Sequence, residues 1–235
     1  MIEQKENFRV KEMLVEGGDK AIFIFTAMGT KIGLYRLFMS MMRKRGYSVV
    51  VYDYPMRSIQ SGDLDVWRLF YKNIIDDAQG RLAKFKAGGV TNFYSYGISM
   101  GTLVANKFAR DTPEISHVVL NMTYGDVADN IWTYKGVKKA KMNIVANGLD
   151  IDDLRKNIVY TDPIHNATAL KGKKVLLYLA KRDRVLRYDQ TKETLRAFRE
   201  AGLQMEYVEN KFLGHFATGA KNLLQVKRLE KFLNT

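Results

Sequence analysis

Short apolar runs alternate along the chain with longer stretches in which apolar residues recur every three or four positions. The short runs have the length of β-strands, and the longer stretches have the period of amphipathic helices. This alternation is typical of a mostly parallel sheet covered by helices on both faces. We therefore predict an α/β fold.

Seven runs have strand length, so we expect a sheet of about seven strands. They cover residues 8–15, 21–26, 47–54, 90–97, 116–122, 173–180 and 204–209. The segment EGGDK, residues 16–20, separates the first two runs, and its paired glycines suit a hairpin turn. The first strand should therefore be antiparallel to the others and lie at an edge of the sheet.

Helical periodicity predicts five further elements. They cover residues 31–45, 67–82, 100–110, 190–201 and 223–232. Gly46 and Gly202 are placed to end the first and the fourth. Ser61 or Asp63 could cap the second at its N-terminus.

One crossover is longer than the others. About fifty residues separate the runs 116–122 and 173–180, whereas the other crossovers take some twenty to forty. We expect a single domain over residues 1–235, with a small helical cap insertion at about 123–169.

The composition excludes several kinds of site. The 235-residue chain has no cysteine and three histidines, which rules out disulfides, thiolate zinc sites and cysteine nucleophiles. No phosphate-binding loop, dinucleotide fingerprint or metal-binding cluster occurs, so we expect no cofactor and no metal. The N-terminus lacks a signal-type apolar core, and no window is apolar enough for a membrane span. We expect a soluble, cytoplasmic protein.

A formal net charge of +13 favours anionic partners. Lysine and arginine are nevertheless scattered, which favours a solvated basic surface; the densest cluster is Lys135, Lys138, Lys139 and Lys141. Without an RNA-recognition signature, we expect no specific nucleic-acid binding. Peripheral contact with an acidic membrane surface stays open.

The segment YGISMG, residues 96–101, lies between an expected strand and an expected helix. It contains the pattern G-x-S-x-G, in which Gly97 and Gly101 flank Ser99. Small residues at these two positions let the chain turn sharply and lift the serine hydroxyl out of the sheet. Ser99 is therefore a candidate nucleophile on a nucleophile elbow.

At this motif the chain resembles the α/β-hydrolase superfamily. The resemblance implies that an acid and a histidine follow the serine in that order, each after a later strand. Asp183 follows the run 173–180, and His215 follows the last strand. A histidine activates the serine, and the carboxylate orients the histidine. His165 is the reserve base, and His117, which opens a strand, is expected to be structural.

The resemblance also implies an oxyanion hole of two backbone amides. One belongs to Met100, the residue after the serine, and the other to Met28, in the loop after the strand 21–26. Both side chains would lie near the reaction centre and suggest an acyl pocket, which Trp132, Phe212 or Phe216 could extend. Methionines that simply fill the core are an equally good explanation.

These residues predict a serine hydrolase, similar to esterases, lipases and thioesterases, that cleaves a carboxylic ester or thioester through an acyl-enzyme on Ser99. The small-molecule acyl substrate would be anionic if the lysines at 135–141 face the pocket. Two alternatives remain: an acyltransferase or other non-hydrolytic enzyme of the same fold, and a non-catalytic basic binding module.

Overall fold

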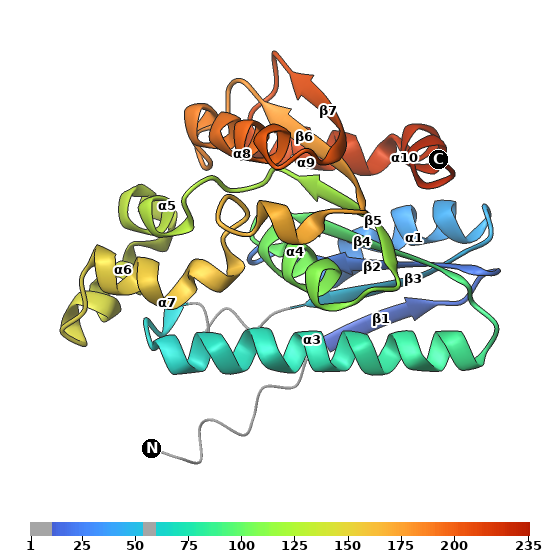
Figure 1. Cartoon of the computed structure of the whole chain (residues 1–235), viewed down its shortest axis with the longest axis horizontal. Coiled ribbons are helices and arrows are strands. Elements are labelled where there is room, and N and C mark those ends of the chain that lie inside the picture. Colours follow the sequence, from blue (N-terminus) through green and yellow to red (C-terminus); the bar gives the residue numbers. More distant parts are fainter. Residues whose placement is uncertain (1–10, 54–59) are drawn as a thin grey trace.

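The computed structural model describes residues 11–53 and 60–235. In this part of the chain, seven strands form one sheet in the order β1-β3-β2-β4-β5-β6-β7 (Figure 1). They are β1 Lys11–Val15, β2 Lys20–Phe25, β3 Tyr47–Asp53, β4 Asn92–Ile98, β5 Ile115–Asn121, β6 Lys174–Ala180 and β7 Gln204–Asn210. Strands β2 to β7 are parallel, and β1 is antiparallel at one edge. The predicted α/β fold with a mostly parallel sheet is confirmed; residues 8–10 and 54 of the expected strands lie outside the described residues.

The predicted hairpin between the first two strands is wrong, because β1 pairs with β3 and not with β2. The paired glycines serve a close crossing instead. The amide of Gly18 donates to the carbonyl of Gly46 at 2.8 Å, and a Cβ on Gly17 would lie 2.4 Å from the Tyr47 backbone. Glycine lets the chain pass tightly over the start of β3 and enter the sheet on its other side.

Helices cover both faces of the sheet (Figure 1). They are α1 Arg36–Arg43, which follows the 3₁₀ turn η2 Ile32–Tyr35, then α3 Leu64–Ala87, α4 Gly101–Asp111, α8 Tyr188–Glu200, α9 His215–Leu224 and α10 Val226–Leu233. Side chains of α1 and α10 pack on one face, and those of α3, α4 and α8 pack on the other. Among the described residues, no helix combines the length and the apolar character that crossing a membrane requires.

Helix ends follow the local sequence closely. Asp63 caps α3, because its carboxylate accepts hydrogen bonds from the backbone amides of Asp65 and Val66. Asp63 is one of the two residues that the sequence predicted for this position. The closing helix differs from the prediction: Gln225, with a ψ of 46°, divides it into α9 and α10. This break lets α10 pack its apolar side on the sheet while α9 starts at the carboxyl end of the sheet, where His215 lies.

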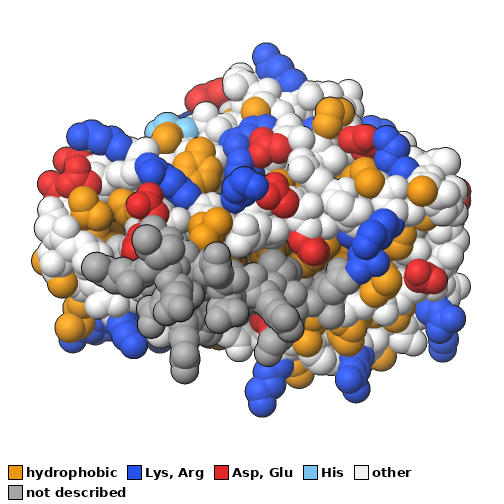
Figure 2. Space-filling view, turned by 90° about the horizontal axis from the view of Figure 1, so that it is seen from below, with side chains coloured by type: hydrophobic (Ala, Val, Ile, Leu, Met, Phe, Trp, Pro, Cys, Tyr) orange, Lys and Arg blue, Asp and Glu red, His pale blue; other side chains and the backbone are white. Residues whose placement is uncertain are grey.

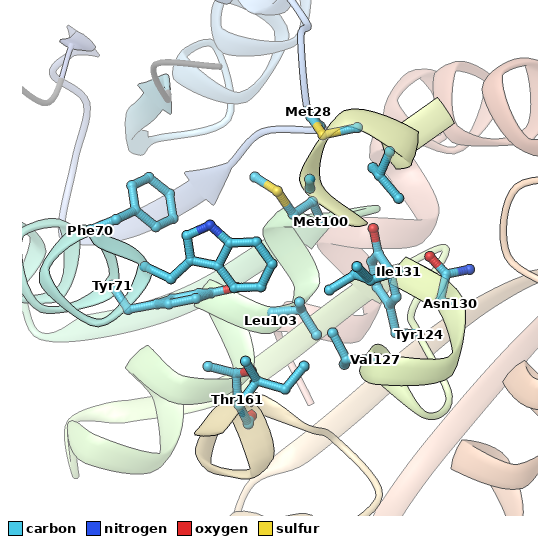
Figure 3. Close-up of a pocket in the computed structure, with 14 residues that line it drawn as sticks. Met28, Phe70, Tyr71, Met100, Leu103, Tyr124, Val127, Asn130, Ile131 and Thr161 are labelled. Carbon is cyan, nitrogen blue, oxygen red and sulfur yellow. Dashed lines mark hydrogen bonds between the residues drawn. The ribbon is translucent and has the colours of Figure 1, made fainter. Parts of the chain in front are cut away.

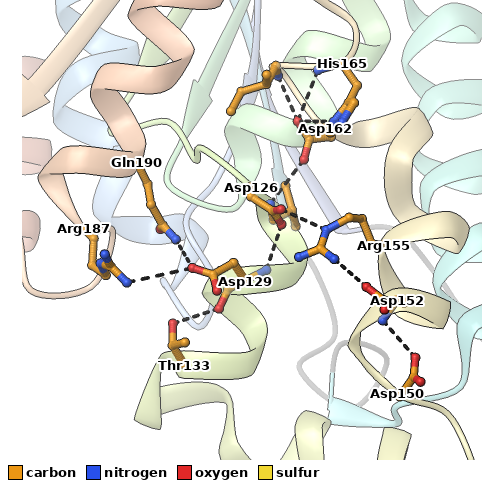
Figure 4. Close-up of polar contacts among 12 residues, drawn as sticks. Asp126, Asp129, Thr133, Asp150, Asp152, Arg155, Asp162, His165, Arg187 and Gln190 are labelled. Atoms are coloured by element: carbon orange, nitrogen blue, oxygen red, sulfur yellow. Dashed lines mark hydrogen bonds and ion pairs between the residues drawn. The ribbon is translucent and has the colours of Figure 1, made fainter.

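Between β5 and β6 the chain forms three helices, α5 Val127–Thr133, α6 Lys138–Ala146 and α7 Ile151–Ile158. Polar contacts hold α5 and α7 to each other and α5 to α8 (Figure 4). The Arg155 guanidinium pairs with Asp126, which caps α5 by accepting the backbone amide of Asp129. The Asp129 carboxylate accepts a hydrogen bond from Gln190 of α8. Asn130 donates to the carbonyl of Val185 at 2.9 Å. The cap helices are therefore tied to the segment that follows β6.

Candidate active site

Ser99 lies at the sharp turn between β4 and α4, with a φ of +52°. This left-handed backbone conformation is unfavourable for any residue other than glycine. A Cβ on Gly97 would lie 2.4 Å from the Cα of Thr102, and one on Gly101 would lie 2.0 Å from the carbonyl oxygen of Phe25. Both glycines therefore allow a turn that no larger residue permits, and the turn presents the Ser99 hydroxyl at the carboxyl edge of the sheet.

The structure brings Ser99, His215 and Asp183 together, although 116 residues separate the first two. Nε2 of His215 lies 2.9 Å from the Ser99 hydroxyl, and Nδ1 lies 2.7 Å from a carboxylate oxygen of Asp183. A carboxylate can only accept here, so Nδ1 carries the proton and Nε2 accepts from the serine. This is the tautomer that a general base for Ser99 requires.

Asp183 is held in place by its own loop after β6. Its second carboxylate oxygen accepts the backbone amides of Val185 at 2.8 Å and Leu186 at 2.9 Å. The side chains of Asp183 and His215 are nearly inaccessible to water. A buried carboxylate with all its partners supplied by the protein is well placed to orient the imidazole and to stabilise its protonated form.

A buried amide network beneath Ser99 fixes the position of α9. Asn121, the last residue of β5, donates to the carbonyl of Gly219 and accepts from Asn222, and its own carbonyl accepts the Ser99 amide at 2.9 Å. The network thus connects the serine turn to the helix that begins with His215. Asn121 and Asn222 were not predicted from the sequence; the position of Asn121 at a strand end was the available signal.

The loop after β2 holds Met28 in a tight turn. The amide of Thr30 donates to the carbonyl of Ala27, and Gly29 has a φ of +73°, which glycine adopts without strain. Tyr35 hydrogen-bonds to this loop through Ala27 and the Thr30 side chain, and burial raises the pKa of its phenol to about 12. The loop is therefore anchored from η2.

The Met28 and Met100 amides are available for an oxyanion. Among the described residues, neither amide donates a hydrogen bond. Both residues line one cavity beside the serine turn, and Met28 also lines the groove that contains Ser99 and His215. Unpaired amides next to a nucleophile are the donors that a tetrahedral intermediate needs.

The cavity beside Met100 is apolar and extends between α3, α4 and the cap (Figure 3). It is narrow, with a cavity volume of about 40 Å³. Its walls include Trp67, Phe70 and Tyr71 of α3 and Val127 and Ile131 of the cap. Trp132, Phe212 and Phe216, which were expected to extend an acyl pocket, do not line it. The α3 side chains close this cavity because the cap sits opposite them.

Tyr124 lines the same cavity and was not singled out in the sequence. Its ring reaches toward the end of the cavity where Met28 and Met100 lie (Figure 3). Burial raises the pKa of the Tyr124 phenol, and a hydrogen bond with the Ser99 side chain acts in the opposite direction. The phenol therefore stays protonated and can donate at the reaction centre.

The remaining candidates lie elsewhere. His165 is exposed and pairs with Asp162 of the cap at 3.3 Å, and His117 packs between the rings of Tyr94 and Phe232. The lysines at 135–141 do not line the cavity; Lys141 lies over the Trp132 ring, 4.7 Å from its centroid. An anionic substrate was expected only if these lysines faced the pocket, and they do not line it. No group of three potential metal ligands occurs among the described residues.

No protein-family model matches the chain, and no curated protein matches it. Solved structures do. An acylaminoacyl peptidase from Pyrococcus horikoshii aligns with a TM-score of 0.71 and 13% identity over 100% of this chain, which spans 43% of the peptidase. A carboxyl esterase from Bacillus coagulans aligns with a TM-score of 0.68 and 12% identity over 97% of this chain and 96% of the esterase. An esterase from Pyrococcus furiosus aligns with a TM-score of 0.64 and 13% identity over 100% of this chain and 93% of the esterase. At these identities the likeness shows the fold.

Proposed function

We propose that this chain, which has the α/β-hydrolase fold, is a serine hydrolase that cleaves a carboxylic ester or thioester through an acyl-enzyme on Ser99. One observation carries the proposal: Asp183, His215 and Ser99 form a continuous hydrogen-bonded series at the carboxyl edge of the sheet. The similar structures are those of esterases and a peptidase, which agrees with a hydrolase.

In the proposed reaction, Nε2 of His215 removes the proton of the Ser99 hydroxyl as its oxygen attacks the carbonyl carbon. The carbonyl oxygen becomes an oxyanion, which the amides of Met28 and Met100 stabilise. His215, now a cation beside the Asp183 carboxylate, returns the proton to the departing alcohol or thiol. Water, deprotonated by the same nitrogen, then releases the acid and restores Ser99.

The two hollows beside Ser99 suit different parts of the substrate. The apolar cavity between α3 and the cap, about 40 Å³ in volume, accepts a small apolar part of the acyl group, because its lining offers few polar partners. The wider groove between the loop after β2 and α9 contains Ser99 and His215 and is open to solvent. It accepts the leaving group and admits water.

A fluorophosphonate probe tests the nucleophile directly, because it phosphonylates an activated serine. Wild-type protein should be labelled, Ser99→Ala should not be, and His215→Ala should be labelled far more slowly. Ser95→Ala is the matched control: Ser95 is also buried in β4, but its hydroxyl donates to the carbonyl of Ala105. Equal labelling of wild type and Ser99→Ala, or none of folded wild type, would falsify the assignment.

A further inference from the structure

The walls of the open groove expose large apolar side chains. Leu34 and Leu37, on η2 and α1, are 72% and 61% exposed, and Phe216 and Leu224, on α9, are 74% and 59% exposed. All four line the groove that contains Ser99. We call these four residues the apolar rim. Exposed apolar groups gathered at the mouth of a site indicate an interaction surface.

The two chain segments that form the apolar rim carry charged side chains of one sign only. The two segments that form it, residues 20–52 and 210–229, contain lysine and arginine but no aspartate or glutamate. Lys31, Arg36 and Lys221 are exposed beside the rim, and none of the three forms an ion pair within the described residues. The rim therefore combines apolar groups with unneutralised positive charge.

The face over which α3 runs is different. There, basic and acidic side chains are interspersed, as the view from below shows (Figure 2). Arg68 pairs with Asp65, and Lys72 pairs with Asp76, both along α3. Acidic neighbours thus neutralise these basic side chains of α3, whereas Lys31, Arg36 and Lys221 at the rim have no such partner among the described residues.

We propose that the apolar rim docks on the surface of an anionic lipid bilayer, with Leu34, Leu37, Phe216 and Leu224 entering the headgroup region. A bilayer offers hydrocarbon below a layer of negative charge, which matches a surface of leucine, phenylalanine and lysine that has few groups for directional hydrogen bonds. A second copy of the chain fits poorly, because two such rims carry the same charge and repel.

Docking in this way places the groove against the lipid surface. If Ser99 is the nucleophile, as proposed above, an acyl ester reaches it from the bilayer without crossing bulk water. The binding step itself needs no chemistry. Ser99→Ala should therefore bind vesicles as tightly as wild type, so that failure to bind and failure to hydrolyse are distinguishable.

Cosedimentation with vesicles tests the docking. Wild-type protein should sediment with vesicles of phosphatidylcholine containing about one third phosphatidylglycerol, and binding should weaken at high salt. The double variant Leu34→Ser/Leu37→Ser should lower the partition coefficient at least about tenfold, since each buried leucine contributes a large apolar term. The matched control is Met142→Ser/Val145→Ser on α6, whose side chains are 58% and 52% exposed. It should bind within about twofold of wild type.

Charge reversal tests the second half of the proposal. Lys31→Glu/Arg36→Glu should lower the partition coefficient at least about tenfold, because each basic group near an anionic surface contributes on the order of fivefold. Lys138→Glu/Lys139→Glu changes the same charge on the exposed side of α6 and should have a much smaller effect. Equal binding of wild type to neutral and anionic vesicles, no binding to either, or equal losses in test and control variants would each overturn the proposal.

Discussion

Two histidines at opposite ends of the sheet are equally buried and have opposite surroundings. His215 and His117 are each 7% exposed. Both ring nitrogens of His215 have polar side-chain partners, Asp183 and Ser99. His117, in β5 near the start of the parallel strands, packs edge-on against Tyr94 and Phe232, with ring centroids 5.4 and 5.2 Å away, and its ring nitrogens meet only the neutral hydroxyls of Ser116 and Thr235 among the described residues.

The difference shows that burial alone does not make a histidine a base. Burial lowers the pKa of His117 to about 4, and the charge of Lys174 adds to the effect, so its ring stays neutral. A ring that stays neutral does not take up a second proton at ordinary pH. At His215, the proposed mechanism relies on Asp183 to supply the negative charge that stabilises the ring once it has taken the proton of Ser99.

Removing the charge of Asp183 should make the surroundings of His215 resemble those of His117. In Asp183→Asn, the amide can donate to Nδ1, which leaves the proton on Nε2, where it can no longer accept from Ser99. The imidazolium also loses its counter-ion. We expect kcat/KM for ester hydrolysis to fall on the order of 10⁴-fold.

Asp189→Asn is the matched control for that variant. Asp189 lies six residues beyond Asp183 in the chain. Its exposed carboxylate, on α8, pairs with Arg187. Its replacement should leave kcat/KM unchanged. Steady-state kinetics with a soluble ester, together with thermal unfolding to verify the fold, gives the comparison. Near-normal turnover in Asp183→Asn would mean that a group other than Asp183 orients the His215 ring.

A smaller effect is expected at Tyr124, whose phenol adds a neutral hydrogen-bonding group beside Ser99. Tyr124→Phe keeps the ring in the cavity wall and removes only the hydroxyl next to Ser99. A neutral hydrogen bond contributes about 0.5–1.5 kcal/mol, so kcat should fall by up to about tenfold, with little change in KM. Tyr178→Phe is the control, since its buried hydroxyl lacks a hydrogen-bond partner among the described residues. An equal fall in both variants would contradict a role for Tyr124 in turnover.

The serine turn and its two partners could be placed from the sequence because each has a local signal. Ser99 has two flanking glycines, and Asp183 and His215 follow apolar runs of strand length. Parallel strands bring their carboxyl ends to one edge of the sheet, so a correct order of strands is enough to bring distant side chains close together. The pattern of apolar residues therefore placed these side chains at strand ends, and the resemblance to the α/β-hydrolase superfamily implied their order and their roles.

Other features depend on which segments meet in space, and no local pattern encodes that. The hydrogen bond between Asn121 and Asn222 spans 101 residues, and neither asparagine lies in a motif. The paired glycines at 17 and 18 suit a hairpin and a close crossing equally well, and only the position of β3 decides between them. Likewise, α3 closes the apolar cavity only because the cap packs opposite it.

The smallest expected effect concerns His117 and is one of stability. Its pKa is about 4 in the folded chain, below the ordinary value of 6.5, so between these values the unfolded chain binds a proton that the folded chain does not. The free energy of unfolding should therefore fall as the pH drops from about 6.5 toward 4, by on the order of 1 kcal/mol at pH 5 from this group.

His117→Phe keeps the edge-on packing against Tyr94 and Phe232 and cannot titrate. Urea unfolding at pH 7 and pH 5 should then show a smaller loss in the variant than in wild type, because carboxylates contribute equally to both. An identical loss in the two proteins would mean that the folded chain binds a proton at His117 as readily as the unfolded chain does. Burial would then not keep this ring neutral.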